Sequence, residues 1–270
     1  MLILLKNIHI LKKYFTFRLK SKPRGGHDIH SPFVYDLYTK SIDIKAKEAI
    51  FERIEELRKE LLKNDSSVSK NNFGSGTKEN DISEPSISRV VKRSSIPPYM
   101  GQLLFRLTDY LKPESIIELG TSAGFSTMYL ASGNKNANVV SIEGDVNLAK
   151  LASANFNKLG LTNVTLINGE FDAKLPDILA SIEKIGLVFI DGNHSDEATL
   201  RYFKLFSAKA CSNSLIIFDD IRWSKGMENA WNNICQDVNV SISIDMFNCG
   251  LVFFRKGIVK QHFNLRYGPF

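Results

Sequence analysis

Three acidic residues follow two apolar runs of the sequence, and carboxylate oxygens are the ligands that hard divalent cations prefer. Asp191 ends the run "IGLVFID", and Asp219 and Asp220 end the run "SLIIFDD". If both runs are neighbouring parallel strands, the three carboxylates meet at one edge of a sheet and repel one another unless a cation lies between them. The pattern therefore predicts a Mg²⁺ or similar site. The alternative is that Asp219 or Asp220 caps the next helix or pairs with Arg222.

A turn rich in small residues follows another apolar run, in "SIIELGTSAGF". Glu118 ends this run, and burying an acid is costly unless it binds something. Gly120 and Gly124 do not have the spacing of a pyrophosphate-binding glycine motif, although any tight strand-to-helix turn favours glycine. Glu143 ends the next apolar run, at the distance where an acid accepts hydrogen bonds from ribose hydroxyls. These residues together favour an adenosine ligand without phosphates.

The elements that position these residues are predicted by alternating patterns from residue 97 onward. Five strand-like apolar runs are each followed by a helical stretch, which is typical of a parallel sheet covered by helices on both faces. Runs 240–247 and 250–257 lie close together and should pair as an antiparallel hairpin. The fold class is therefore α/β and doubly wound. Ligands of such sheets bind outside the carboxyl ends of the strands, where the strand order reverses.

The N-terminal part of the chain has a different texture, so we expect a helical extension with a polar loop over 1–95 and the sheet domain over 96–270. Residues 1 to about 22 predict a basic amphipathic helix. It would pack on the main domain or on a partner subunit, giving a homodimer through these helices; lying on an anionic membrane surface is the alternative. A second helix is expected within 45–63, and the polar stretch 64–86 reads as a linker or mobile loop.

Composition sets broad limits on function. The 270 residues are 43% hydrophobic, which is enough for a sizeable core, and the net charge of +6 permits an acidic partner without requiring one. The three cysteines include no CxxC pair, so a zinc site or disulfide framework is not expected, and a cytoplasmic location fits. The apolar opening is too short and too charged for a transmembrane segment.

Two motifs resemble those of a known superfamily. "ELGTSAGFST" resembles the first motif of class I S-adenosylmethionine-dependent methyltransferases, and "SIEGD" resembles their second. The resemblance implies a seven-stranded Rossmann-like sheet with an antiparallel last strand, and S-adenosylmethionine as cofactor. It also implies a set of donor-binding residues, with Glu143 at the ribose and the range 169–172 beside the adenine: Glu118, Gly120, Ser122, Gly124, Glu143, Gly169, Asp172 and Asp191.

Within that superfamily the chain resembles the catechol O-methyltransferase type and its bacterial relatives. In these enzymes an Asp after the fourth strand and an acidic pair after the fifth bind Mg²⁺, which implies Asp191, Asp219 and Asp220 here. A lysine three residues beyond the first Asp commonly acts as general base, and this sequence has His194 there. Histidine can serve because its usual pKa near 6.5 keeps it neutral around pH 7. A loop histidine that only hydrogen-bonds locally is the alternative.

The expected activity is transfer of a methyl group from S-adenosylmethionine to a hydroxyl oxygen of a small molecule, assisted by a divalent metal, with Asp191 and His194 as catalytic residues. "DGNH" differs from the Asp/Asn-Pro-Pro-aromatic motif typical of methyltransferases that modify amino groups of nucleic-acid bases. The positive charge and "RVVKRSS" leave open O-methylation of a hydroxylated tRNA base. A non-enzymatic membrane-associated or scaffold module is the third hypothesis.

Overall fold

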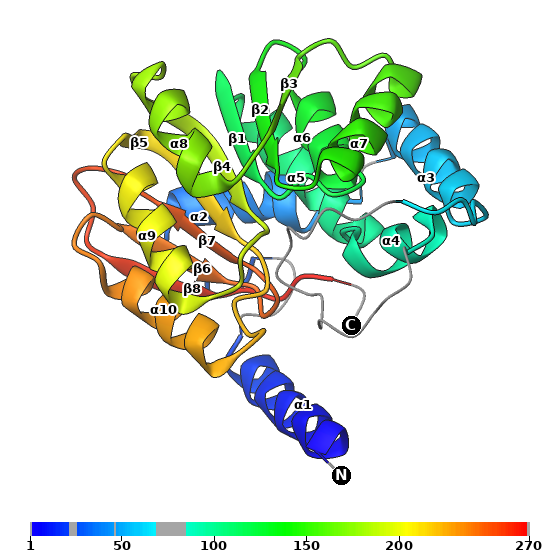
Figure 1. Cartoon of the computed structure of the whole chain (residues 1–270). Helices are drawn as coiled ribbons and strands as arrows, with labels where there is room; N and C mark the ends of the chain where they lie inside the picture. The colour runs from blue at the N-terminus through cyan, green and yellow to red at the C-terminus, as the bar shows by residue number, and fades with distance from the viewer. Residues whose placement is uncertain (1, 22–25, 46, 69–84, 269–270) are drawn as a thin grey trace.

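A single mixed sheet forms the centre of the computed structural model, which describes residues 2–21, 26–45, 47–68 and 85–268 (Figure 1). Its strand order is β3-β2-β1-β4-β5-β7-β6-β8. The strands are β1 (Ser115–Leu119), β2 (Asn138–Glu143), β3 (Val164–Asn168), β4 (Ile185–Ile190), β5 (Ala210–Phe218), β6 (Ile242–Asp245), β7 (Gly250–Phe253) and β8 (Gln261–Asn264).

The strand directions confirm the predicted topology. Strands β1 to β5 are parallel, and β7 runs antiparallel to both β5 and β6. The order reverses between β1 and β4, whose carboxyl ends therefore border the expected ligand crevice.

The predicted number of seven strands is wrong, because the sheet has eight. Strand β8 pairs in parallel with β6, with Ile242 opposite Gln261 and Asp245 opposite Asn264. Its four residues "QHFN" contain a single apolar side chain. Such a segment has no periodic pattern from which a strand could be predicted.

Helices cover both faces of the sheet. The α-helices are α1 (Leu2–Lys20), α2 (Pro32–Leu37), α3 (Ala49–Leu61), α4 (Ile87–Ser94), α5 (Pro98–Leu111), α6 (Phe125–Gly133), α7 (Val146–Leu159), α8 (Phe171–Ala180), α9 (Asp196–Ser207) and α10 (Lys225–Gln236), and η1 (Tyr38–Ile42) is a π-helix. Side chains alternate across each strand, so Ile116 packs with α2 to α7 while Ile117 packs with α8 to α10.

The N-terminal helices share the core of the sheet domain. The Phe51 ring of α3 lies 4.9 Å from Phe105 and 5.6 Å from Tyr129. The Arg58 guanidinium lies 4.0 Å from the Phe125 ring and donates to a backbone carbonyl ahead of α5. The predicted helix within 45–63 is thus confirmed as α3. The polar stretch 64–86 lies largely outside the described residues.

Helix α1 confirms the first predicted helix, and its C-terminal half packs on the main domain. The Tyr14 and Phe17 rings lie 5.0 and 5.5 Å from the Phe247 ring. Arg266 donates to the carbonyl of Arg18 at 2.7 Å, near the end of the helix. The rest of α1 extends away from the sheet in Figure 1. None of the helices in the described ranges is long and apolar enough to cross a membrane.

Candidate functional site

The turn after β1 is built from glycines that protein neighbours require. Gly120 has φ 98°, and a Cβ there would overlap the carbonyl oxygen of Asp191, in the segment after β4. Gly124 has φ 87°, and a Cβ there would lie 2.5 Å from the ring of Phe156 on α7. The small residues at this turn therefore bring the ends of β1 and β4 together and seat α6 against α7.

Glu118 is a fully buried acid with one unsatisfied oxygen. Its Oε2 accepts hydrogen bonds from the hydroxyls of Thr127 and Ser141. Its Oε1 has no hydrogen-bond partner among the described residues. Burial raises the pKa of Glu118 to about 7, although neighbouring hydroxyls act in the opposite direction. A buried acceptor without a partner suits a donor group on a ligand, an ammonium above all.

Glu143 joins the glycine turn to the end of β2. Its Oε2 accepts from the backbone N–H of Ser122 at 2.7 Å, and its Oε1 accepts from that of Asp145 at 2.9 Å. Burial raises the pKa of Glu143, and these two backbone bonds oppose the rise. Each carboxylate oxygen can accept a second hydrogen bond, so a ligand hydroxyl can still bind. The Ser122 hydroxyl is buried and without a partner in the part of the chain that the structure describes.

Gly169 and Asp172, which both follow β3, lie in different surroundings. The backbone N–H of Gly169 donates to the carbonyl of Glu143 at 2.9 Å, which keeps Gly169 beside the carboxyl end of β2. Asp172, in the first turn of α8, instead binds both Nε and Nη2 of Arg201, at 2.9 and 2.7 Å. This ion pair is half exposed and links α8 to α9. Asp172 therefore points to a helix neighbour and is not brought together with Glu118 and Glu143.

The three aspartates after β4 and β5 share one electrostatic environment. The backbone N–H of Asp219 donates to the Ile190 carbonyl at 3.0 Å, so the two strand ends are level. Burial raises the pKa of Asp191 well above its usual value, and the charges of Asp219 and Asp220 add to the rise. Burial and the charge of Asp220 also raise the pKa of Asp219 to about 7. The charges of these aspartates therefore act on one another, as expected if the three acids converge at one edge of the sheet.

The alternative roles considered for Asp219 and Asp220 are wrong. The N-cap of α10 is Ser224, whose hydroxyl accepts from the Met227 N–H at 3.1 Å. Arg222 pairs with Asp245 through two bonds of 2.9 and 2.6 Å. Neither acid is thus used as the helix cap or by Arg222.

The donor set suits a hard cation, because three carboxylates that repel one another would be relieved by a positive charge. Within the described ranges, however, no group of three or more His, Cys, Asp or Glu side chains is arranged so that it could hold a metal ion together. Asp191, Asp219 and Asp220 are partly buried acids, and their burial raises the pKa of each.

His194 lies beside this acid cluster. Its Nε2 is 3.7 Å from Asp191 Oδ1, and its ring centroid is 5.9 Å from that of Trp223. Burial lowers the pKa of His194, while the charge of Asp220 acts to raise it. The imidazole is therefore neutral around pH 7 and can accept a proton. Trp223 is 55% exposed, so one wall of this region is an aromatic ring open to solvent.

Sequence reasoning missed the hydroxyl groups that hold Glu118. Ser141 lies in β2, directly opposite Glu118 in the register, and Thr127 lies in the first turn of α6. The available signal was a serine inside the otherwise apolar "NVVSIE", because an isolated hydroxyl in a buried strand needs a polar partner.

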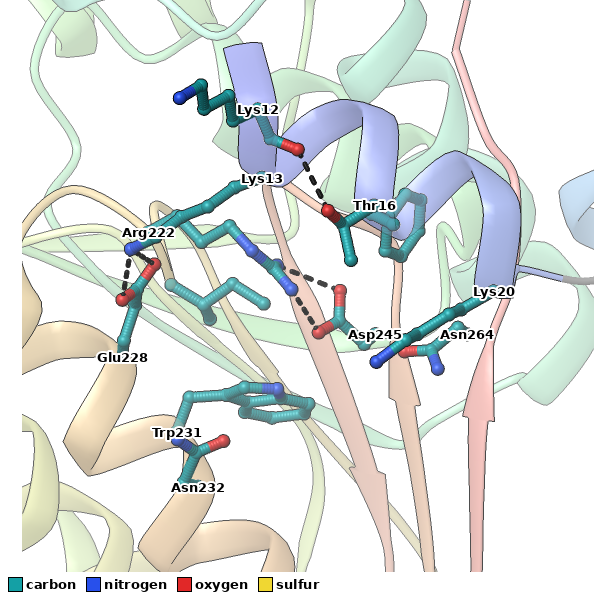
Figure 2. A pocket seen from close by; sticks show the side chains of 12 residues that line it. Lys12, Lys13, Thr16, Lys20, Arg222, Glu228, Trp231, Asn232, Asp245 and Asn264 are labelled. Atoms are coloured by element: carbon teal, nitrogen blue, oxygen red, sulfur yellow. Dashed lines mark hydrogen bonds and ion pairs between the residues drawn. The ribbon is translucent and has the colours of Figure 1, made fainter. Parts of the chain in front are cut away.

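A cavity of about 570 Å³ lies between α1 and α10, and Figure 2 shows the side chains that line it. Lys13, Phe17 and Trp231 are among them, together with Arg222, which stands two residues after Asp220 in sequence. None of the predicted donor-binding or metal-binding residues lines this cavity. The cavity is therefore separate from the predicted site.

Comparison with known proteins agrees with this geometry. Residues 117–221 match a family model described as a methyltransferase domain. The chain is 29% identical over 133 residues to a catechol O-methyltransferase of Niastella koreensis, covering 47% of this chain and 58% of that protein. It is 27% identical to a catechol O-methyltransferase of Mycobacterium tuberculosis, covering 48% and 58%. The chain thus spans a little over half the length of these relatives.

Solved structures show the same fold. An O-methyltransferase from Bacillus cereus in complex with SAH superposes with a TM-score of 0.57 at 18% identity, covering 82% of this chain and 97% of that one. The O-methyltransferase TomG from Streptomyces achromogenes in complex with SAM gives a TM-score of 0.57 at 16% identity, covering 82% and 96%. The Rossmann-like methyltransferase fold and the resemblance to catechol O-methyltransferases are therefore confirmed.

Replacement of Gly120 by alanine should disrupt the contact between the ends of β1 and β4. A methyl group there overlaps the Asp191 carbonyl, and φ 98° is unfavourable for alanine. We expect the free energy of unfolding to fall by about 3 kcal/mol or more in urea titrations. Gly160→Ala is the matched control, because Gly160 has φ 70° with nothing within 4 Å. It should cost only about 1 kcal/mol. Equal losses in the two variants would contradict this role of Gly120.

Replacement of Glu118 by glutamine should change how stability depends on pH. Because the folded pKa of Glu118 is raised, its contribution to stability is present below about pH 4.5 and lost as pH rises through about 7. Glutamine has no charge to bury. The difference in free energy of unfolding between the variant and wild type should therefore shift by about 2–3 kcal/mol in favour of the variant from pH 5 to pH 8. Denaturant titrations of the ligand-free protein at both pH values measure this difference. Glu60→Gln is the control, because Glu60 is exposed beside Lys158, and it should show no such shift. If the difference between Glu118→Gln and wild type does not change with pH, the raised pKa of Glu118 is refuted.

Proposed function

We propose that this protein transfers a methyl group from S-adenosylmethionine to a hydroxyl oxygen of a small molecule. In this proposal residues 96–270 form the methyltransferase domain and residues 1–95 a helical extension. The observation that carries it is the close approach of Gly120 to Asp191. That contact supports the proposal because it brings the turn beside Glu118 and Glu143 close to Asp191, which in turn lies 3.7 Å from His194. A methyl donor on one side therefore meets an acceptor on the other.

The donor crevice has groups for each polar part of S-adenosylmethionine. The unpaired oxygen of Glu118 would accept from the ammonium of the methionine part, forming a charge-assisted hydrogen bond. The remaining lone pairs of Glu143 would accept from the ribose hydroxyls. Gly169 would lie beside the adenine. Asp172 stays with Arg201 in this proposal, because leaving that ion pair would free both side chains without any partner shown to replace it.

The acceptor side supplies alignment and a base. To hold a divalent cation, the side chains of Asp191, Asp219 and Asp220 would have to turn closer together than they lie in the described structure; such a cation would lower the pKa of the substrate hydroxyl. A neutral imidazole nitrogen of His194 would take the hydroxyl proton. The oxygen then attacks the methyl carbon in line with the sulfur, and the carbon–sulfur bond breaks to leave S-adenosylhomocysteine. Most of the catalytic gain would come from holding these atoms in position.

His194→Ala tests the base. With a labelled methyl donor and a panel of phenols and catechols, turnover should fall by about 10²- to 10⁴-fold, because a positioned base contributes on that scale. The dissociation constant for S-adenosylmethionine, measured by calorimetry, should stay within about twofold. His262→Ala is the control, because His262 binds Ser243 at 2.8 Å at the far edge of the sheet. A loss of donor affinity with normal turnover would rule out His194 as the base.

Asp219→Asn tests the cation. The variant should lose both turnover and the binding of Mn²⁺, used as a paramagnetic substitute for Mg²⁺, because one of three carboxylate ligands becomes a neutral amide. Asp109→Asn is the control, since Asp109 forms an exposed pair with Lys112. Wild-type activity that survives EDTA, together with absent Mn²⁺ binding, would count against the metal while leaving methyl transfer itself intact.

A further inference from the structure

The outward face of α1 is an apolar stripe without a cover. Leu11, Phe15 and Leu19 are 54%, 61% and 87% exposed. They recur every four residues and therefore share one face of the helix. The opposite face carries Tyr14 and Phe17, which pack on Phe247. We call Leu11, Phe15 and Leu19 the outer stripe.

An exposed cation borders the outer stripe. Lys12 forms no ion pair with any residue in the described ranges, and in Figure 2 its side chain points away from the pair that Lys13 forms with Glu228 at 2.6 Å. Lys20 lies on the other side of the helix, where it lines the cavity between α1 and α10 near Asn264. The sequence has no acidic residue before Asp28. The charges that α1 itself contributes are therefore all positive.

The positive charges of α1 distinguish between the possible binding partners of the outer stripe. In a symmetric pair of α1 helices the same surface meets itself, so two helices that carry lysines and no acid would be brought together. A nucleic acid would match the lysines but leave Phe15 and Leu19 against water. An anionic lipid surface satisfies both, because acyl chains receive the apolar side chains and headgroup phosphates receive the cations.

We propose that α1 lies on the surface of an anionic bilayer, with the outer stripe in the acyl boundary and Lys12 among the headgroup phosphates. The stem of Lys12 can follow the apolar surface while its ammonium group reaches the phosphates. The sequence repeats the same spacing upstream, with apolar residues at positions 4 and 8.

Docking leaves the fold unchanged, because the inner face of α1 is held independently. Lys13 binds Glu228 through both carboxylate oxygens, and Arg266 donates to the Arg18 carbonyl and the Ser21 hydroxyl. These contacts lie on the side of the helix away from the outer stripe. The whole protein would therefore bind the membrane as a rigid unit.

Co-sedimentation of the full-length protein with vesicles tests the proposal. Wild type should bind vesicles of phosphatidylglycerol and phosphatidylcholine in equal parts, bind pure phosphatidylcholine at least about tenfold more weakly, and be released by high salt. The triple variant Leu11→Ser, Phe15→Ser, Leu19→Ser should bind the anionic vesicles at least about tenfold more weakly. Lys12→Gln should bind the anionic vesicles about fivefold more weakly. The control Val238→Ser with Val259→Ser removes two side chains that are 93% and 82% exposed elsewhere, and should bind like wild type.

Three results would overturn the proposal. They are absence of wild-type binding to the anionic vesicles, equal binding to pure phosphatidylcholine, and a wild-type dimer in light scattering that the triple variant converts to monomers. Circular dichroism and S-adenosylmethionine binding check that each variant is folded. If the triple variant does not fold, Phe15→Ser alone decides, because a single exposed side chain should not affect folding.

Discussion

The contact between Gly120 and the carbonyl of Asp191 is the constraint on which the candidate site depends. A parallel sheet separates neighbouring strand ends by about 5 Å and leaves their loops free to diverge. Here the backbone after β1 touches the backbone after β4, and only a residue without a side chain permits it. The turn is fastened on its other side by Glu143, which binds the Ser122 N–H. The ends of β1 and β2, which carry Glu118 and Glu143, and the segment that begins with Asp191 are thereby fixed relative to one another.

The same contact concentrates negative charge in a buried region. Glu118 is fully buried and Asp191 and Asp219 are partly buried, and burial is the largest cause of the raised pKa in all three. Such a region is unfavourable for the ligand-free protein at neutral pH. A ligand with an ammonium and a sulfonium, and a divalent cation beside it, would each lower that cost. The buried acids would thus lower the stability of the ligand-free protein at neutral pH, and the same acids would favour the binding of positively charged ligands.

The sequence was sufficient for the features that repeat along the chain or stand at strand ends. Apolar runs alternating with helical stretches predicted the parallel strands and the hairpin, and acids directly after apolar runs could only lie at carboxyl ends. Partners chosen by tertiary structure were not predictable. Arg222 forms its ion pair with Asp245, which lies 23 residues away in sequence, and Asp172 forms its ion pair with Arg201, 29 residues away. Strand β8 was missed because its few residues carry no alternation and pair only once β6 is in place.

Arg222 occupies a junction whose effect reaches beyond its ion pair with Asp245. Its guanidinium also lies 5.6 Å from the ring of Phe17 on α1 and 4.8 Å from that of Phe247, and it stands two residues after Asp220. A change in how α1 sits would therefore alter the contacts of a side chain that stands two residues from Asp220. If such a change alters ligand binding at the strand ends, thermodynamic linkage requires that ligand binding alter the seating of α1 by a coupling free energy of equal size.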